Sequence, residues 1–242
     1  MTNLVLIHGF GMTKQIFDDL IEQLSPKFNC INISLPEDEP TDSEIYELDE
    51  LLEFIEKQVS EPAIWLGWSF GGMLALAFAK YRPHLVQKLI LVSSTAKFIA
   101  SDNWKYAVSL PEFMGFYLGL VEDYPQTMRN FFTLQTLGNT DRLELIQQLE
   151  KTIKTTPDIQ ALTNQLAILS TLDLRQDLAK INQNTVWIMG EYDRLCFVEA
   201  AQQSSKLMPN SSVVILQKCN HIPFITHKKL FVKTVLTWIK SN

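Results

Sequence analysis

The chain has 242 residues, a hydrophobic content of 46% and a formal net charge of −6. A chain of this length buries a full hydrophobic core and fits one domain, with room for an inserted subdomain. The acidic balance excludes a general basic surface that would hold a polyphosphate backbone, so we expect no nucleic-acid partner.

Short apolar segments alternate with helical segments over the first part of the chain. Strands are expected at residues 4–7, 31–35, 63–66 and 89–92, and helices at residues 16–24, 45–59 and 73–80. This alternation is typical of a parallel sheet whose strands are joined by crossover helices. The acidic segment at residues 37–50 is expected to be a solvated loop that leads into the second of these helices.

The alternation breaks off after residue 96 and returns near residue 181. Between these points no strand pattern is convincing, and helices are expected at residues 142–154 and 159–172. An interruption of roughly eighty residues is far longer than a usual crossover connection. We therefore predict a helical cap, residues 97–180, inserted into a core of residues 1–96 and 181–242, with ordinary crossover helices as the alternative. After the cap, strands are expected at residues 186–189 and 213–216, and helices at residues 198–207 and 228–239.

The segment Gly67-Trp68-Ser69-Phe70-Gly71 lies between the third expected strand and the third expected helix. A G-x-S-x-G sequence at such a turn is typical of a nucleophile elbow, which raises the serine hydroxyl above the edge of the sheet. Ser69 is therefore the candidate nucleophile, and a glycine-rich turn without a catalytic role is the alternative. The amide of Phe70, at the start of the helix, is expected to point toward an acyl oxygen.

A serine hydroxyl needs a base that removes its proton during attack. His221 directly follows the last expected strand and precedes the last expected helix. The carboxyl ends of parallel strands are where open α/β sheets gather reactive groups. His221 is therefore the candidate base, and a structural loop histidine is the alternative. The other histidines are His8, His84 and His227.

The base in turn needs a group that holds its tautomer and supports its positive charge. Asp193 follows the strand expected at residues 186–189, so it should lie at the same edge of the sheet. The chain order Ser69, Asp193, His221 is that of one known triad architecture. Asp193 is therefore the candidate third member. The alternatives are Glu191, Asp173 and Asp177.

The segment His8-Gly9-Phe10-Gly11 follows the first expected strand. Loops of this H-G-x-G type supply a backbone donor for the oxyanion of an acyl-transfer intermediate. Two glycines let the backbone approach the substrate closely. We therefore expect the amides of Phe10 and Phe70 to form the oxyanion hole, and a merely flexible turn is the alternative for the Phe10 loop.

Together, these motifs resemble the α/β-hydrolase superfamily over nearly the whole chain. Further segments are similar to the pimeloyl-[acyl-carrier protein] methyl ester carboxylesterases of biotin synthesis. These are residues 64–69 at the elbow, 131–138 in the cap, 168–176 at its exit and 221–225 near the end. The cap segments are more specific than the elbow, which many unrelated hydrolases share.

The resemblance implies an α/β-hydrolase fold, with a mostly parallel sheet flanked by helices and an inserted helical cap. Two features depart from the family. Phe10 stands where the family often has tryptophan, and the chain begins almost at the first parallel strand, so we expect a truncated amino-terminal sheet edge. The backbone donor at position 10 is retained.

In that family the cap segment that corresponds to residues 131–135 lines the acyl pocket. The resemblance therefore implies a substrate site made of Phe10, Ser69, Phe70, Phe131, Phe132, Thr133, Leu134, Gln135 and His221.

The carrier-protein partner of the family is acidic, and the resemblance implies that basic cap residues receive it. Lys151 and Lys154 lie three residues apart, on one face of the helix expected at residues 142–154. Solvated helix charges are the alternative. The candidate docking residues are Arg129, Arg142, Lys151 and Lys154.

The function implied is that of a serine carboxylesterase that hydrolyses the methyl ester of pimeloyl-acyl-carrier protein through an acyl-enzyme, without a metal or an organic cofactor. A broad-specificity short-acyl carboxylesterase or a C–C bond hydrolase is the alternative with the same triad. In another class, the alternative is a ligand-binding receptor on a hydrolase scaffold.

The rest of the sequence bears on the setting of the protein. No stretch approaches the roughly twenty apolar residues that span a bilayer, and no charged segment precedes an apolar run at the amino terminus. The three cysteines, Cys30, Cys196 and Cys219, have no C-x-x-C spacing and predict neither a disulfide framework nor a zinc site. We therefore expect a cytoplasmic monomer that does not associate with membranes.

Overall fold

The computed structural model describes residues 1–36 and 47–241. Its strands form one sheet in the order β2-β1-β3-β4-β5-β6, in which every described pair is parallel. This confirms the predicted parallel sheet. The strands are Thr2–Ile7 (β1), Phe28–Asn32 (β2), Ala63–Trp68 (β3), Val86–Val92 (β4), Asn184–Gly190 (β5) and Ser211–Leu216 (β6).

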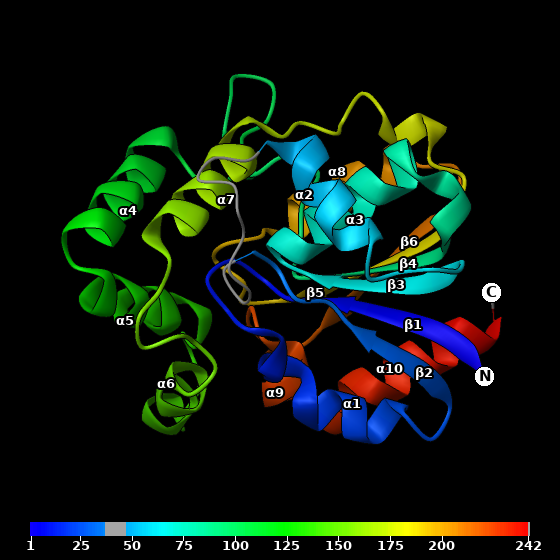
Figure 1. The fold of residues 1–242 in the computed structure, drawn as a ribbon, viewed down its shortest axis with the longest axis horizontal. Helices are drawn as coiled ribbons and strands as arrows, with labels where there is room; N and C mark the ends of the chain where they lie inside the picture. The colour runs from blue at the N-terminus through cyan, green and yellow to red at the C-terminus, as the bar shows by residue number, and fades with distance from the viewer. Residues whose placement is uncertain (37–46, 242) are drawn as a thin grey trace.

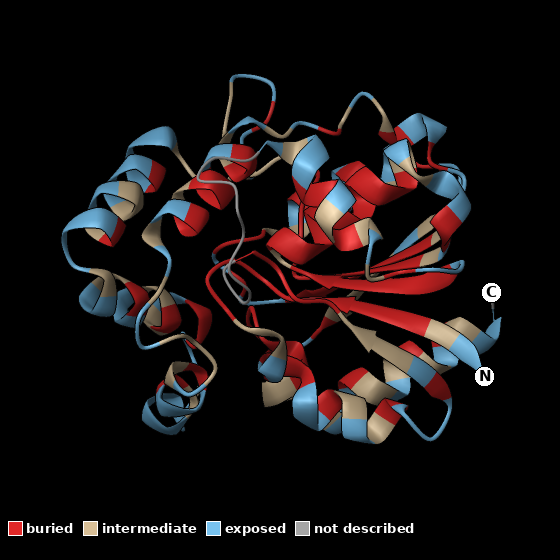
Figure 2. Ribbon diagram, viewed as in Figure 1, coloured by how far each residue is buried: buried red, intermediate tan, exposed pale blue. Residues whose placement is uncertain are grey.

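The sheet is covered by helices on both faces, with α2, α3 and α8 on one side and α1 and α10 on the other (Figure 1). A parallel strand covered on both faces must be apolar throughout, and all six residues of β3 are buried. The edge strands β2 and β6 are mostly half-buried (Figure 2). The bounds of these helices are Asp18–Leu24 (α1), Leu48–Glu56 (α2), Phe70–Tyr81 (α3), Val198–Leu207 (α8) and Lys228–Ser241 (α10).

Shorter helical turns complete the core: Lys14–Phe17 (η1), Pro83–Leu85 (η2), Leu178–Lys180 (η3) and Pro223–Thr226 (α9). No helix among the residues described above combines the length and apolar character that crossing a bilayer requires.

One predicted element differs from the structure near the second strand, and another is mostly untested. The predicted bounds of this strand, residues 31–35, are wrong, because β2 spans Phe28–Asn32. Ile33 and Leu35 are fully buried beyond the strand end, so their apolar pattern reflects core packing rather than strand pairing. Most of the predicted acidic loop, residues 37–46, lies outside the described residues, and α2 begins at Leu48.

Four helices are inserted between β4 and β5 and lie beyond the carboxyl ends of the strands (Figure 1). Three of these helices have an N-cap side chain that accepts a hydrogen bond from a backbone amide in the first turn. Ser109 accepts from Glu112 N, Asp123 from Gln126 N and Asp158 from Ala161 N. The bounds are Leu110–Glu122 (α4), Tyr124–Gln135 (α5), Arg142–Glu150 (α6) and Ile159–Thr171 (α7).

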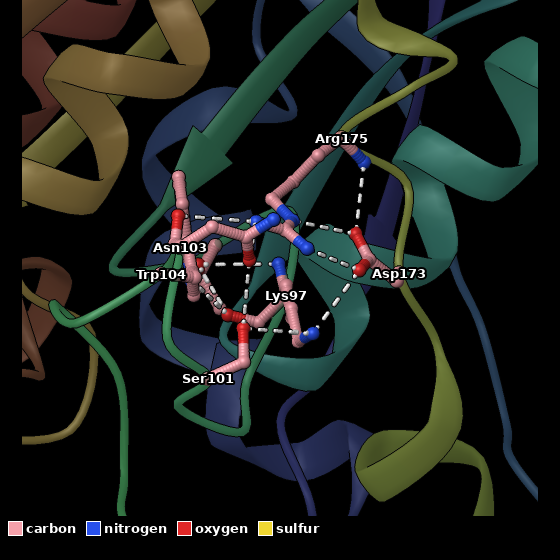
Figure 3. Close-up of polar contacts among 7 residues, drawn as sticks. Lys97, Ser101, Asn103, Trp104, Asp173 and Arg175 are labelled. Atoms are coloured by element: carbon pink, nitrogen blue, oxygen red, sulfur yellow. Dashed lines mark hydrogen bonds and ion pairs between the residues drawn. The ribbon is translucent and has the colours of Figure 1, made fainter.

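The two connections between these helices and the core are joined by a polar cluster around Asp173 (Figure 3). The Asp173 carboxylate accepts from Arg175 Nη2 at 2.7 Å and Nε at 2.8 Å, and it pairs with Lys97 Nζ at 3.2 Å. Arg175 also donates to Asn103 Oδ1 at 3.0 Å and lies over the Trp104 ring. Hydrogen bonds from Arg175, with a further contribution from Lys97, hold the pKa of Asp173 at about 2.

Replacing Asp173 with asparagine is expected to lower the midpoint of thermal unfolding near neutral pH by about 2–4 °C. The pKa of Asp173 in the folded state, about 2, lies below the unfolded value of roughly 3.9. The carboxylate therefore stabilises the fold above the unfolded pKa, and this contribution is lost as the pH falls toward 2. Thermal unfolding followed at several pH values, with the exposed Asp102→Asn as control, tests this. A midpoint difference that persists at the acid end would contradict it.

Candidate active site

Ser69 occupies a strained turn between β3 and α3. Its φ of 55° and ψ of −119° are unusual for a residue other than glycine, and such strain costs on the order of 1–3 kcal/mol. The surroundings fix this conformation: Ser69 N donates to Val92 O at 2.9 Å, and Ser94 Oγ donates to Ser69 O at 2.7 Å. The sequence therefore forms the predicted elbow, with α3 starting directly after Ser69.

The glycines of the elbow are required by close backbone contacts. A Cβ at Gly71 would overlap the carbonyl oxygens of Ile7 and His8, and one at Gly67 would overlap the carbonyl of Gly71. These contacts bring the start of α3 against the end of β1. The elbow and the loop that carries Phe10 are thereby held next to each other.

Gly71→Ala is expected to destabilise the fold by about 1–3 kcal/mol and to reduce activity with it, because two backbone carbonyls cannot both move aside. Gly115→Ala is the matched control, since its Cβ would meet nothing within 4 Å and alanine is favoured inside a helix such as α4. Denaturant unfolding of both variants measures the difference. Equal stability of the two variants would mean that the close contact at Gly71 is not required.

The structure brings His221 and Asp193 into direct contact below the elbow. His221 Nδ1 lies 2.8 Å from Asp193 Oδ2, and both side chains are almost completely buried. The other carboxylate oxygen, Oδ1, accepts from the amides of Leu195 and Cys196 at 2.9 and 3.0 Å. Because both oxygens are occupied, the carboxylate is fixed in place and fixes the imidazole in turn.

Backbone contacts join the loops that carry this pair. Tyr192 N donates to Cys219 O at 2.7 Å, and Trp68 Nε1, next to the elbow serine, donates to His221 O at 2.9 Å. The loops after β3, β5 and β6 are therefore assembled at one edge of the sheet.

The alternative acids have other partners. Glu191 Oε2 accepts from Lys218 N at 2.8 Å on the surface. Asp173 pairs with Arg175, and Asp177 pairs with Lys80 at 2.7 Å. Among the four acids considered, Asp193 is the one that contacts His221.

Ser69 and His221 are not hydrogen-bonded to each other: the buried His221 Nε2 has no hydrogen-bond partner in the part of the chain that the structure describes. The Ser69 side chain lies near the thiol of Cys196. Burial, followed by the nearby charge of Asp193, raises the pKa of this thiol well above its usual range, so it stays protonated. Catalytic hydrogen bonds commonly tighten only when substrate binds. Nε2 is thus an available acceptor for the Ser69 proton.

The two predicted oxyanion donors lie at adjacent strand ends. Phe10 follows β1 and Phe70 is the first residue of α3, where the amide points out of the helix and carries part of its positive dipole. Within residues 1–36 and 47–241, neither amide donates to another group. Two such donors are what a developing oxyanion needs.

Ser69 lies on the wall of an apolar cavity of about 400 Å³ between the inserted helices and the sheet edge. Aromatic rings form much of this wall: Phe10 packs edge-on against Phe116, with 5.7 Å between ring centroids. Phe116 in turn lies 5.1 Å from Phe131. The cavity is lined by Phe10, Ser69, Phe98, Ala107, Val108, Glu112, Phe113, Phe116, Phe131, Leu134, Leu166, Leu169, Arg194, Leu195 and Phe197.

The predicted acyl-pocket segment, residues 131–135, is only partly on this cavity. Phe131 and Leu134 line it, because they are three apart on α5 and share one face. Phe132 and Gln135 are buried and Thr133 is half-buried, and none of these three is among the described residues that line the cavity. His221 and Phe70 lie behind the cavity wall rather than on it.

Several cavity residues were not predicted from the sequence. Arg194, Leu195 and Phe197 follow the candidate acid directly, so their position after β5 was a usable signal. The cavity residues from α4 and α7 gave no such signal in the sequence, because the rotation of a helix against its neighbours depends on packing that a single sequence does not display.

The predicted docking residues are spread over the inserted helices. Arg129 on α5 pairs with Glu150 at 3.6 Å, and Arg142 is the first residue of α6. The prediction that Lys151 and Lys154 share a helix face is wrong, because α6 ends at Glu150. Both lysines instead line a groove of about 330 Å³ together with Lys14.

No group of three or more His, Cys, Asp or Glu side chains that could hold a metal ion occurs among the residues described.

Comparison with known proteins matches this chain to a family. The alpha/beta hydrolase fold family matches residues 2–228. The pimeloyl-[acyl-carrier protein] methyl ester esterase of Yersinia pseudotuberculosis serotype O:1b is 32% identical over 99% of this chain and 94% of that protein. The esterase of the same name from Aliivibrio fischeri is 30% identical over 100% of this chain and 95% of that protein.

Solved structures share the fold at lower identity. An esterase from Exiguobacterium antarcticum superimposes with a TM-score of 0.90, at 20% identity over 99% of this chain and 92% of that one. MenH from S. aureus gives a TM-score of 0.81 at 21% identity, covering 99% of this chain and 94% of that one. The sequence matches over nearly the whole chain are consistent with the observed parallel sheet and its inserted helices. The chain therefore belongs to the alpha/beta hydrolase family.

Proposed function

We propose that this hydrolase is a serine carboxylesterase with Ser69 as nucleophile, His221 as base and Asp193 as the group that orients His221. The observation that carries the proposal is the buried His221–Asp193 pair, at 2.8 Å, beside a strained elbow serine that lines an apolar cavity. A buried carboxylate fixes the imidazole with its proton on Nδ1, which leaves Nε2 free to accept a proton.

The reaction follows from this arrangement. The Ser69 hydroxyl rotates to His221 Nε2, loses its proton to it and attacks the ester carbonyl, and the oxyanion accepts from the amides of Phe10 and Phe70. His221 then gives the proton to the departing methoxide, which leaves as methanol. Water deprotonated by His221 attacks the acyl-enzyme, and the acid is released as Ser69 regains its proton.

For the substrate, we propose the methyl ester of a pimeloyl group on acyl-carrier protein. The 30–32% identical relatives are pimeloyl-[acyl-carrier protein] methyl ester esterases, which supports this class of substrate. The apolar cavity, with Phe131 and Leu134 on its wall, suits a hydrocarbon chain that leads to Ser69.

For the carrier, we propose docking on the basic side chains Arg129, Arg142, Lys151 and Lys154. The groove lined by Lys14, Lys151 and Lys154 supports this, because it gathers three ammonium groups. An acidic partner would be attracted to such a groove even though the whole chain is acidic.

The test is complementation of a biotin-requiring strain that lacks its pimeloyl-carrier methyl esterase, with the Ser69→Ala chain as control. In vitro, methyl pimeloyl-carrier protein is compared with free short-chain aryl esters. A higher kcat/KM for the carrier substrate supports the proposal. A preference for the aryl esters indicates a broad esterase, and complementation by Ser69→Ala indicates a receptor.

A further inference from the structure

Arg194 places a positive charge on the wall of the cavity that contains Ser69. The residue directly follows Asp193 and is exposed, yet its side chain lines the same cavity of about 400 Å³. Most of the other lining residues are apolar, and Glu112 is the only other charged one among them. Arg194 is therefore the positively charged residue on the wall of the space in which a substrate chain would lie.

Glu112 does not neutralise this charge by direct pairing. Its carboxylate accepts from Ser109 Oγ at 2.6 Å and from Ser109 N at 3.1 Å, as part of the cap of α4. Arg194 forms no hydrogen bond or ion pair within the described part of the chain. Its donors are available to a ligand.

The backbone at Arg194 is held in place from both sides. The amides of Leu195 and Cys196 donate to Asp193 Oδ1, so the turn that carries Arg194 is fixed to the same carboxylate that holds His221. Arg194 thus keeps a fixed relation to the candidate catalytic pair.

A planar guanidinium with free donors binds carboxylate or phosphate oxygens in a bidentate manner, and it gains nothing from a hydrocarbon chain. We propose that Arg194 is a specificity-determining residue that binds an oxyanion carried by the substrate beyond its apolar acyl chain. The inference rests on the proposed esterase function. The oxyanion has two possible sources: a carboxylate at the far end of a free half-ester, or the phosphate of a carrier's pantetheine arm.

Chain-matched substrates separate charge recognition from esterase chemistry. Monomethyl pimelate and methyl heptanoate share a seven-carbon chain and differ in the terminal carboxylate. Methyl pimeloyl thioesters of phosphopantetheine and of pantetheine differ in the phosphate.

Arg194→Gln is expected to lower kcat/KM about tenfold or more for the charged substrate of one pair, because its KM rises, and to leave kcat/KM for the neutral substrate of that pair unchanged. Arg194→Lys is expected to restore part of the loss.

Lys206→Gln, which removes an exposed charge on α8 away from the cavity, is the control. The substrate pair for which Arg194→Gln no longer prefers the charged member identifies the source of the oxyanion. Equal losses for charged and neutral members, or no loss in either pair, would overturn the proposal. If the enzyme does not turn over pimeloyl esters, monomethyl succinate and methyl butyrate repeat the comparison, so that failure of the proposed substrate and failure of the Arg194 proposal are distinguished.

Discussion

Ser69→Ala is expected to reduce kcat for ester hydrolysis by roughly 10⁴-fold or more while the fold remains intact. The hydroxyl is the only group in the cavity wall placed on a nucleophile elbow, and no activated thiolate replaces it, since burial raises the pKa of Cys196 well above its usual range. The backbone contacts of Ser69 with Val92 and Ser94 use its amide and carbonyl, and alanine keeps both. The loss should therefore appear in kcat and not in stability.

The matched control is Ser170→Ala, which removes the hydroxyl of a half-buried α7 serine bonded back to Ala167 O. Initial rates with a methyl ester and labelling with a serine-directed fluorophosphonate measure both variants. Ser69→Ala should lose turnover and labelling together, and Ser170→Ala should keep both. Turnover by Ser69→Ala within tenfold of the unchanged chain would remove Ser69 from the mechanism.

The parts of the site that were predictable are those set by local sequence or by sheet topology. Gly67, Ser69 and Gly71 lie within one strand-turn-helix unit, so their spacing predicts the elbow directly. Asp193 and His221 are distant in sequence, but both follow parallel strands, and the carboxyl ends of such strands share one edge. The pairing of these two side chains was therefore predictable without knowing the detailed packing.

Other features depend on tertiary contacts that the pattern does not carry. Helix α6 ends at Glu150, and the carbonyl of Thr152 beyond it accepts from both the amide and the hydroxyl of Thr13. A core loop thus binds the segment in which a longer helix was predicted. The same holds for Phe132, which packs into the core while Phe131 faces the cavity, because the rotation of α5 is set by its neighbours.

The orientation of Ser69 was not predictable either. The sequence predicts which three side chains carry the chemistry, but the separation of the Ser69 hydroxyl, which lies near Cys196, from His221 Nε2 depends on side-chain rotamers. Cys196 gives no signal of its own in the sequence, since a buried cysteine usually serves as a small packing residue. The state of the triad before substrate binds is thus a property of the folded site.

Asp193→Asn is expected to lower kcat by roughly 10⁴-fold, because neither orientation of the amide preserves the hydrogen bonds of the carboxylate. If the amide oxygen accepts from Leu195 and Cys196, the NH₂ group faces His221 Nδ1, which must then accept. The imidazole proton moves to Nε2, which can no longer take the proton of Ser69. If the amide is reversed, its NH₂ group faces two buried amide donors, which costs about 1–3 kcal/mol for each unsatisfied group.

Glu191→Gln is the matched control, because Glu191 was the nearest alternative acid and its carboxylate accepts from Lys218 N at the surface. A glutamine oxygen can accept the same hydrogen bond, so this variant should keep kcat within a few-fold. The pair of variants decides which acid supports the base: a large loss in Glu191→Gln together with a small one in Asp193→Asn would reverse the assignment. A large loss in Asp193→Asn alone, with the methyl ester and the fluorophosphonate alike, locates the defect in activation of Ser69, because both reagents depend on His221 Nε2 as proton acceptor.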